Sequence, residues 1–431
     1  MTRVAVIGGG YSGTAQAILL ARAGLQVTLI ERSPEAGRGA AYGTERPEHL
    51  LNVRASAMSA FADAPAHFAT WYEAQGGTAA DFAPRRDYSR YIREQLAAAG
   101  IDIVHGEAVD IAGDAVLLAD GRRVAADRTV LAIGNLPPEV PRAIPAEVRH
   151  SKFYIADPWA GEIGGDLRDD DVVLLLGTGL TAIDTILTLD AQGFRGRILA
   201  VSRRGLRPRA HAAPGPAPIG LTKPPPARCV SLLAAVREDA TALGWRAAVD
   251  RLRPVTQALW SSAPLDERRR FLRHLRPWWD VHRHRIAPQV SDRLDALVGE
   301  GRLEFAAAKL GAVSLSGSGA IVELRRRGRE DAEKLAVQRI VNCTGPQADI
   351  SRAHQPLLDA LLAAGKIRPD PLRIAIDVDA ESRTIGANGI ASDDLIAIGP
   401  MTRGAFWETV AVPDIRNQVS AVAALLARSR S

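Results

Sequence analysis

The chain has 431 residues, of which 47% are hydrophobic and 24% charged, and its formal net charge is +5. This length predicts two or three domains, since a domain usually has roughly 100 to 200 residues. No apolar run approaches the ~20 residues of a membrane helix, and the cysteines, Cys229 and Cys343, form no Cys-x-x-Cys pair. The arginines are scattered and form no basic stripe interleaved with aromatics. We therefore expect a cytoplasmic globular protein with no membrane span, disulfide scaffold, dithiol relay or nucleic-acid partner.

The N-terminal segment has the pattern of a dinucleotide-binding unit. Residues 4–7 predict a buried parallel strand, and Gly8, Gly10 and Gly13 allow a tight turn into a helix whose N-terminus would face a pyrophosphate. Glu31 ends the second predicted strand, close to the offset of about 20 residues at which an acid binds an adenosine ribose. The segment therefore predicts an ADP-containing cofactor, and the alternative is a glycine-rich structural turn.

The same pattern recurs in the middle of the chain. An apolar run at 172–176 leads into Gly177 and Gly179, and Ala182 takes the third glycine position, where a small side chain is sufficient. The next predicted strand ends in Ser202, Arg203 and Arg204, where the first unit has its acid. Guanidinium groups bind a 2′-phosphate that a carboxylate would repel, so this unit predicts NADPH and the first predicts FAD. Alternatively, the arginines are only the solvated end of a strand.

Two further strands end in glycine and proline, at 134–138 and 345–346, and both predict crossings between nucleotide domains. A late strand ending at Gly399, followed by a helix from about Val412, would return the chain to the first domain. The segments 39–43 and 50–59 predict a loop that carries Asn52, Arg54 and Ser56 in apolar surroundings. Such a loop could hold a flavin or simply connect two elements.

Residues 206–300 predict a helical insertion within the second nucleotide domain. Helical spacing runs over 231–259 and 265–284, and we expect Pro277 to break the second run. Four tryptophans lie here, Trp245, Trp260, Trp278 and Trp279. They could cover a substrate as part of a lid or form the core of the insertion itself.

The insertion also holds His274, His282 and His284 among many arginines. No carboxylate or cysteine completes a set of metal ligands with these histidines, so we expect no metal site. The arginines could bind an anionic substrate or the NADPH phosphates, or form a solvated helix face.

The elements together predict an α/β fold with two Rossmann-like dinucleotide-binding domains and a helical insertion. We expect an FAD-binding domain from 1–140 and 346–431, and an NADPH-binding domain from 141–345 with the insertion at about 206–300.

This set of motifs resembles the two-dinucleotide-binding-domain flavoproteins, and within them the FAD-NAD(P)-binding family related to class B flavin monooxygenases and N-hydroxylating monooxygenases. The resemblance implies FAD contacts at Gly8, Gly10, Ser12, Gly13, Glu31, Asn52, Gly134, Gly345 and Gly399. It implies NADPH contacts at Gly177, Gly179, Thr181, Ala182, Ser202, Arg203 and Arg204. Residues 151–161 lack the histidine of the Baeyer–Villiger signature F-x-G-x-x-x-H-x-x-x-W, which disfavours the formation of esters from ketones.

The resemblance implies an NADPH-consuming monooxygenase that transfers oxygen from a flavin C4a-(hydro)peroxide to a small molecule, with O2 as co-substrate. Asn52 and Arg54 are the candidate catalytic groups beside the reacting flavin face. One alternative is a reductase or dehydrogenase that transfers no oxygen. Another is a nucleotide-binding redox module without catalysis.

Overall fold

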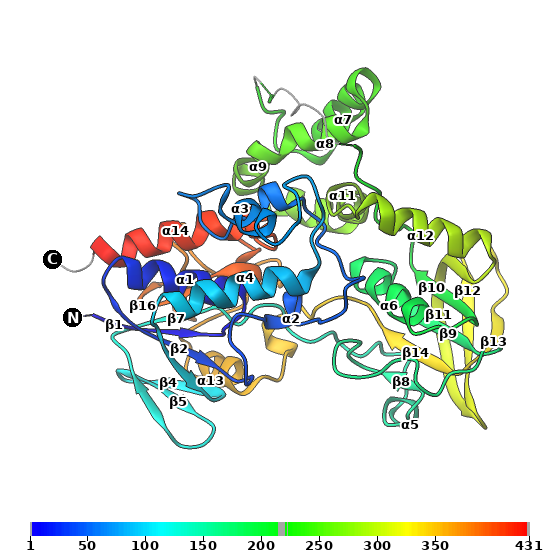
Figure 1. Ribbon diagram of the computed structural model, residues 1–431, viewed down its shortest axis with the longest axis horizontal. Helices are drawn as coiled ribbons and strands as arrows, with labels where there is room; N and C mark the ends of the chain where they lie inside the picture. Colours follow the sequence, from blue (N-terminus) through cyan, green and yellow to red (C-terminus); the bar gives the residue numbers. More distant parts are fainter. Residues whose placement is uncertain (1, 214–219, 222, 429–431) are drawn as a thin grey trace.

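The computed structural model describes residues 2–213, 220–221 and 223–428, so positions 214–219 and 222 of the predicted insertion lie outside the described part. Figure 1 shows two α/β halves side by side, with a lobe of helices above their junction. Both termini lie at the far edge of the first half (Figure 1). None of the described helices is long and apolar enough to cross a membrane. The expected α/β fold with two Rossmann-like sheets is confirmed.

The first half is built on a six-stranded sheet in the order β15-β16-β7-β1-β2-β3. All neighbouring strands are parallel except β15 and β16. The strands are β1 Arg3–Ile7, β2 Gln26–Glu31, β3 Asp102–His105, β7 Arg128–Leu131, β15 Arg383–Ile385 and β16 Ala391–Ala397.

Side chains of β1 alternate between the two faces of this sheet. Val4 and Val6 pack under three helices, α1 Tyr11–Arg22, α4 Arg85–Ala98 and α14 Val412–Arg428. Ala5 and Ile7 face the opposite layer. That layer consists of α13 Pro356–Ala363 and a three-stranded sheet, β4 Ala108–Ala112, β5 Ala115–Leu118 and β6 Arg123–Ala125. Short helices complete the half: α2 Gly39–Tyr42, α3 His67–Glu73, and 3₁₀ turns at Ala55–Ala57, Ile350–Arg352 and Gly399–Thr402.

The second half has a seven-stranded sheet in the order β13-β12-β11-β10-β9-β14-β8, in which β11, β10, β9, β14 and β8 are parallel. Its strands are β8 Tyr154–Ile155, β9 Val172–Leu176, β10 Arg197–Ser202, β11 Leu303–Ser316, β12 Gly319–Arg326, β13 Glu333–Val337 and β14 Arg339–Asn342. Helices α6 Leu180–Ala191 and α12 Pro288–Gly299 cover one face. The short helix α5 Ala146–Arg149 packs on the other.

The lobe contains more and shorter helices than the sequence predicts. They are α7 Cys229–Leu243, α8 Trp245–Leu252, a 3₁₀ turn Arg253–Val255, α9 Thr256–Ser262, α10 Leu265–Arg270, a π turn Phe271–Leu275 and α11 Arg276–Arg283. The expected run 231–259 is divided at Gly244, whose φ of +82° suits glycine. The second run is divided beside Pro277 as expected, because α11 begins at Arg276 after the π turn and this proline lies in its first turn, where its missing N–H costs no hydrogen bond.

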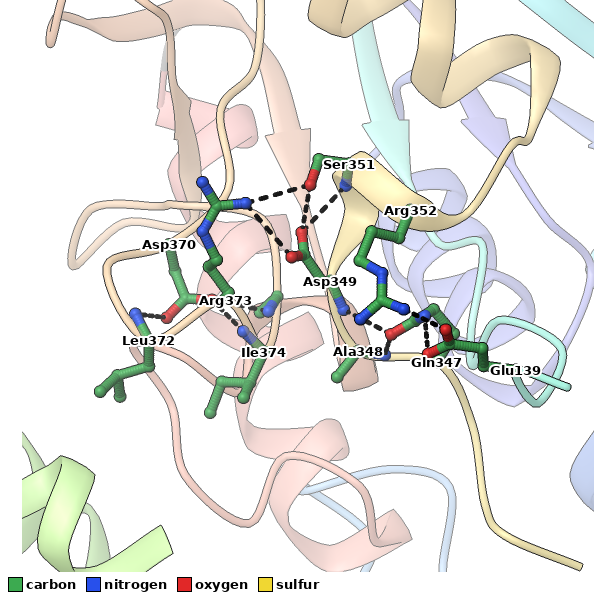
Figure 2. Close-up of polar contacts among 11 residues, drawn as sticks. Glu139, Gln347, Ala348, Asp349, Ser351, Arg352, Asp370, Leu372, Arg373 and Ile374 are labelled. Atoms are coloured by element: carbon green, nitrogen blue, oxygen red, sulfur yellow. Dashed lines mark hydrogen bonds and ion pairs between the residues drawn. The ribbon is translucent and has the colours of Figure 1, made fainter. Parts of the chain in front are cut away.

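The two segments that cross between the halves are tied to each other. Gln347 donates its backbone N–H to Pro137 O at 3.1 Å and its side-chain amide to Glu139 Oε2 at 2.9 Å. Arg352 forms an ion pair with the same glutamate, as Figure 2 shows. The chain that leaves the first half therefore runs hydrogen-bonded beside the chain that returns to it.

A second cluster in Figure 2 fixes the loop that follows the return crossing. Asp370 accepts hydrogen bonds from the backbone N–H groups of Leu372 and Ile374, at 2.8 and 2.7 Å. Arg373, in this loop, reaches back to Asp349 Oδ2 at 3.2 Å. These contacts join the two ends of the segment 349–373, whose residues 355–358 line a cavity of the first half.

Candidate nucleotide-binding and active site

The first glycine turn is too tight for side chains. Gly8 has a φ of +105°, and a Cβ there would lie 2.5 Å from Ala132 O. A Cβ at Gly13 would lie 1.8 Å from Gly8 O, so α1 packs directly on the turn. Gly10 caps α1 without a side-chain hydrogen bond, which leaves the first amides of the helix for an anionic ligand.

A cavity of about 800 Å³ opens over this turn, within the range of roughly 300 to 1,000 Å³ for organic ligands. Five of the predicted FAD residues line it, Gly8, Gly10, Ser12, Glu31 and Gly134. Gly13 lies beneath the turn. Gly399 adjoins the lining, because a Cβ there would lie 2.6 Å from Ser12 Oγ.

Glu31 holds the turn as well as facing the cavity. Its Oε2 accepts from Gly9 N at 2.5 Å, and its Oε1 accepts from Ser33 N at 2.7 Å. An ionised carboxylate has about four acceptor positions, so hydrogen bonds from a ribose can be added to these two. The acid therefore positions the loop and remains able to bind sugar.

The second glycine turn repeats this geometry. Gly177 has a φ of +132°, and a Cβ there would lie 2.1 Å from Cys343 O, the counterpart of Ala132 O. Gly179 caps α6 without a side-chain hydrogen bond. Ala182 is fully buried against the sheet, as its position in the motif requires. Thr181, beside it in the first turn of α6, is half-buried.

Ser202 connects this turn with the end of β10. Its Oγ accepts from Thr178 Oγ1 at 2.9 Å and from Gly205 N at 3.0 Å. Arg203 is exposed and Arg204 half-buried at the same strand end. Neither guanidinium has a hydrogen-bond or ion-pair partner among the described residues, so both can meet a phosphate.

The predicted catalytic residues lie outside the lining of the large cavity. Asn52 accepts, through its backbone oxygen, a hydrogen bond of 3.0 Å from His211 Nε2. Arg54 donates to Ala212 O at 2.8 Å, and its guanidinium lies 4.6 Å from the ring centroid of Phe82. Their described contacts join the first half to the segment after β10. A place beside the flavin stays a prediction for both.

The predicted site residues do not include several aromatic and apolar residues that line the large cavity. They are Tyr42, Trp159, Pro400, Val410 and Ile415. Trp159 follows β8 of the second half, so the cavity is completed across the junction of the two halves. Burial raises the pKa of Tyr42, whose phenol is therefore neutral. The available signals were the Gly-Ala-Ala-Tyr run at 39–42 and the Asp-Pro-Trp run at 157–159.

Two histidines of the lobe, His282 and His284, lie beside protein oxygens. His282 Nδ1 lies 2.7 Å from Trp278 O, and His284 Nε2 lies 3.9 Å from Glu408 Oε1. Within the described part of the chain, no group of three His, Cys, Asp or Glu side chains could hold a metal ion.

Comparison with known proteins gives the class of the fold. Residues 5–136 match the model of a family described as FAD-NAD(P)-binding, which identifies an FAD-NAD(P)-binding domain in the first half. Ornithine hydroxylase from Pseudomonas aeruginosa is similar over 100% of both chains, with a TM-score of 0.69 and 14% identity. L-lysine 6-monooxygenase from Pseudomonas syringae gives a TM-score of 0.69 and 16% identity over 100% of both chains. The chain therefore has the fold of the two-dinucleotide-binding-domain flavoproteins.

Two other similarities are weaker. A bacillithiol disulfide reductase from Bacillus cereus has a TM-score of 0.58 and 16% identity over 100% of this chain and 99% of that one. A glycerol-3-phosphate dehydrogenase [NAD(P)+] from Nocardia farcinica is 46% identical over 66 residues, which cover 15% of this chain and 20% of the dehydrogenase. A match over a fifth of that protein gives no activity for this chain.

Proposed function

We propose that the chain is a cytoplasmic FAD- and NADPH-dependent monooxygenase that acts on a small molecule with O2. The observation that carries the proposal is the pair of glycine turns, one in each half, which share their backbone geometry and differ at the end of the following strand. The first has Glu31 there, and the second has Arg203 and Arg204. On this proposal, FAD is bound by the domain of residues 1–140 and 346–431, and NADPH is bound by the domain of residues 141–345.

The residues present fit both dinucleotides. Gly8, Gly10, Ser12 and the uncapped start of α1 would hold the FAD pyrophosphate, and Glu31 its ribose. For NADPH the corresponding group is Gly177, Gly179, Thr181 and Ala182, with Ser202, Arg203 and Arg204 at the 2′-phosphate. Gly13, Gly134, Gly345 and Gly399 would let the backbone lie close to these ligands, and Asn52 and Arg54 remain candidates beside the ring. FAD, when bound, supplies hydride acceptance and oxygen activation.

The cysteines disfavour a dithiol relay, the chemistry that a reductase of this fold could use. Burial raises the pKa of Cys343 to about 12 and that of Cys229 to about 11, so neither is a thiolate at neutral pH. Cys343 packs behind the second glycine turn, and Cys229 lies in the lobe. In the proposed reaction one atom of O2 enters the substrate and the other leaves as water, while NADPH and a proton supply the electrons and hydrogen.

The test is reduction of the FAD-loaded protein by NADPH without oxygen, followed by rapid mixing with oxygenated buffer. We expect NADPH to bleach the flavin, and oxygen then to give a transient spectrum that belongs neither to oxidised nor to reduced flavin. Substrate screening with ¹⁸O₂ should find the label in one product. Direct return of the oxidised spectrum, with no labelled product, would favour the reductase. Failure of NADPH to reduce the flavin would contradict both enzymatic functions and leave the non-catalytic module.

A further inference from the structure

The helical lobe contains a second cavity of about 520 Å³, separate from the one over the first glycine turn. Helices α7 to α11 form most of its wall, and Trp407 of the first half completes it. Five of the seven tryptophans of the chain line it, Trp245, Trp260, Trp278, Trp279 and Trp407. Its volume is within the range of roughly 300 to 1,000 Å³ for small-molecule sites, which are lined mainly by apolar and aromatic side chains.

Helix α7 packs on α8, but the described part of the chain leaves its apolar side chains only partly covered. None of the 15 residues of this helix is buried, although Leu232, Leu233 and Val236 face the cavity. Helices of globular proteins normally bury such an apolar stripe against another element. An apolar ligand in the cavity would provide the missing contact.

The cavity wall is poorly suited to a cation. Glu267 is the only carboxylate among the described lining residues, and it already accepts from Cys229 N at 2.8 Å and pairs with Arg270 at 2.8 Å. Arg268 is similarly engaged with the backbone oxygens of Ala263 and Ser261. A buried ammonium group would find no unpaired acid here, and arginines already lie over the rings of Trp245, Trp260 and Trp407.

One short segment forms a wall of both cavities. Trp407 lines the lobe cavity and Val410 lines the glycine-turn cavity, only three residues further along the chain. The residues between them are fixed to the lobe, because Glu408 Oε1 accepts from Trp279 Nε1 at 2.7 Å and Thr409 Oγ1 accepts from Gln257 at 3.4 Å. A molecule in the lobe cavity would therefore be separated from the glycine-turn cavity by this one short segment.

We propose that the lobe cavity is the substrate site and that it takes an uncharged aromatic or alicyclic molecule rather than an amino acid or a diamine. The role of the cavity as a substrate site rests on the proposed function, whereas the binding of an apolar molecule in it does not. The substrate would differ in class from the ornithine and lysine in the names of the similar hydroxylase and monooxygenase.

The test is a titration of the FAD-loaded protein with N-phenyl-1-naphthylamine, an uncharged probe whose fluorescence rises in apolar surroundings. We expect saturable one-site binding with quenching of tryptophan emission. Val236→Asp should weaken binding at least roughly tenfold, since it places a charge in the cavity wall. Val230→Asp is the matched control, because Val230 lies on the same helix and is 77% exposed. Val236→Thr, nearly isosteric, keeps the test valid if the aspartate variant does not fold.

Naphthalene should displace the probe and raise NADPH oxidation, whereas L-ornithine and cadaverine should do neither. The proposal would be overturned if the probe did not bind saturably or if ornithine displaced it. It would also be overturned if Val230→Asp weakened binding of the probe as much as Val236→Asp. So would a lower sedimentation mass of Val236→Asp, which would make the apolar face a contact between copies. If the flavin is reduced and naphthalene binds without stimulating NADPH oxidation, the substrate assignment fails. If the protein binds naphthalene but NADPH does not reduce its flavin, the result would instead contradict the proposed function.

Discussion

Arg85, in the first turn of α4, forms an ion pair with Asp184 of α6, and their Nη1 and Oδ2 atoms are 2.8 Å apart. The pair joins the two halves, and the side chains are only 13% and 7% exposed. Burial raises the pKa of Asp184, and Arg85 acts in the opposite direction. His49 Nε2 lies 3.1 Å from the backbone oxygen of Asp184, so the same position carries a second contact between the halves.

Replacing Arg85 should show how much this arginine offsets the cost of burying the Asp184 carboxylate. Arg85→Ala leaves the Asp184 carboxylate buried without a counter-charge and should lower the free energy of unfolding by roughly 3–5 kcal/mol, measured with urea. A carboxyl group whose pKa is raised by folding stabilises the protein at low pH and loses that contribution as pH rises through the folded pKa. The loss in Arg85→Ala should therefore shrink as pH falls.

The control for this prediction is Arg86→Ala. Arg86 lies beside Arg85 on α4, is 44% exposed, and approaches Asp87 only to 3.9 Å. Exposed pairs of this kind contribute about 0–1 kcal/mol. Adding Asp184→Asn to Arg85→Ala should recover part of the lost stability, because the uncompensated charge is removed. An equal loss in both single arginine variants would contradict the role of the pair.

Substitutions in the two glycine turns should impair the binding of different dinucleotides. Gly8→Ala places a Cβ 2.5 Å from Ala132 O and should give a protein that is purified without FAD. Gly177→Ala, with a Cβ 2.1 Å from Cys343 O, should keep FAD but lose reduction by NADPH. The control is Gly161→Ala, where a Cβ meets nothing within 4 Å. Flavin content and stopped-flow reduction measure the outcomes, and loss of FAD from the Gly177 variant would contradict the assignment of the halves.

Arg203 and Arg204 should determine the preference of the protein for NADPH over NADH. Removing both guanidinium groups should raise the KM for NADPH at least roughly tenfold, since each charge-assisted hydrogen bond contributes about 1.5–3 kcal/mol, and should leave the KM for NADH nearly unchanged. Arg195→Ala, at an exposed site before β10 that pairs with Asp190 at 3.7 Å, is the control. Equal use of NADPH by the wild type and the double variant would mean that the arginines are only a solvated strand end.

The sequence predicts those parts of the site that depend on local geometry. The roles of Gly8, Gly177 and Glu31 can be predicted from the order of strand, turn and helix. The end of the strand determines where the amides at the start of the following helix point. Trp159 and Val410 meet across the large cavity only after the two halves have packed, and no local pattern contains that placement. Trp260 and Phe271 of the lobe likewise pack on Trp407, which lies far along the chain and outside any local window.

His211 should make the junction of the halves sensitive to acid. Burial lowers its pKa to about 4, and its Nε2 lies 3.0 Å from Asn52 O, so the neutral ring donates this hydrogen bond. A histidine whose pKa folding depresses contributes stability above its unfolded pKa of about 6.5 and loses it as pH falls toward 4. The melting temperature should fall over that window, and less so in His211→Gln. An identical pH profile in the two proteins would contradict the assignment.

Glu408 holds the lobe onto the first half from an unfavourable backbone conformation. Its φ is +75°, a region that favours glycine, yet its side chain is only 5% exposed and lies 3.0 Å from Arg283 Nε. It also accepts the hydrogen bond from Trp279 Nε1. Glu408→Gln can keep the tryptophan contact but leaves Arg283 buried, with Asp414 at 3.8 Å as its nearest remaining carboxylate.

We therefore expect Glu408→Gln to weaken docking of the lobe by roughly 3–5 kcal/mol, the usual effect of breaking a buried pair. Hydrogen exchange should accelerate in 245–283, while exchange in α1 and β1 should stay unchanged. Comparing Glu408→Gly with Glu408→Ala separates backbone from charge, because both lack the carboxylate and only alanine retains the strain. The glycine variant should be more stable by about 1 kcal/mol. Wild-type exchange rates in the Glu408→Gln lobe would show that the carboxylate does not hold the two parts together.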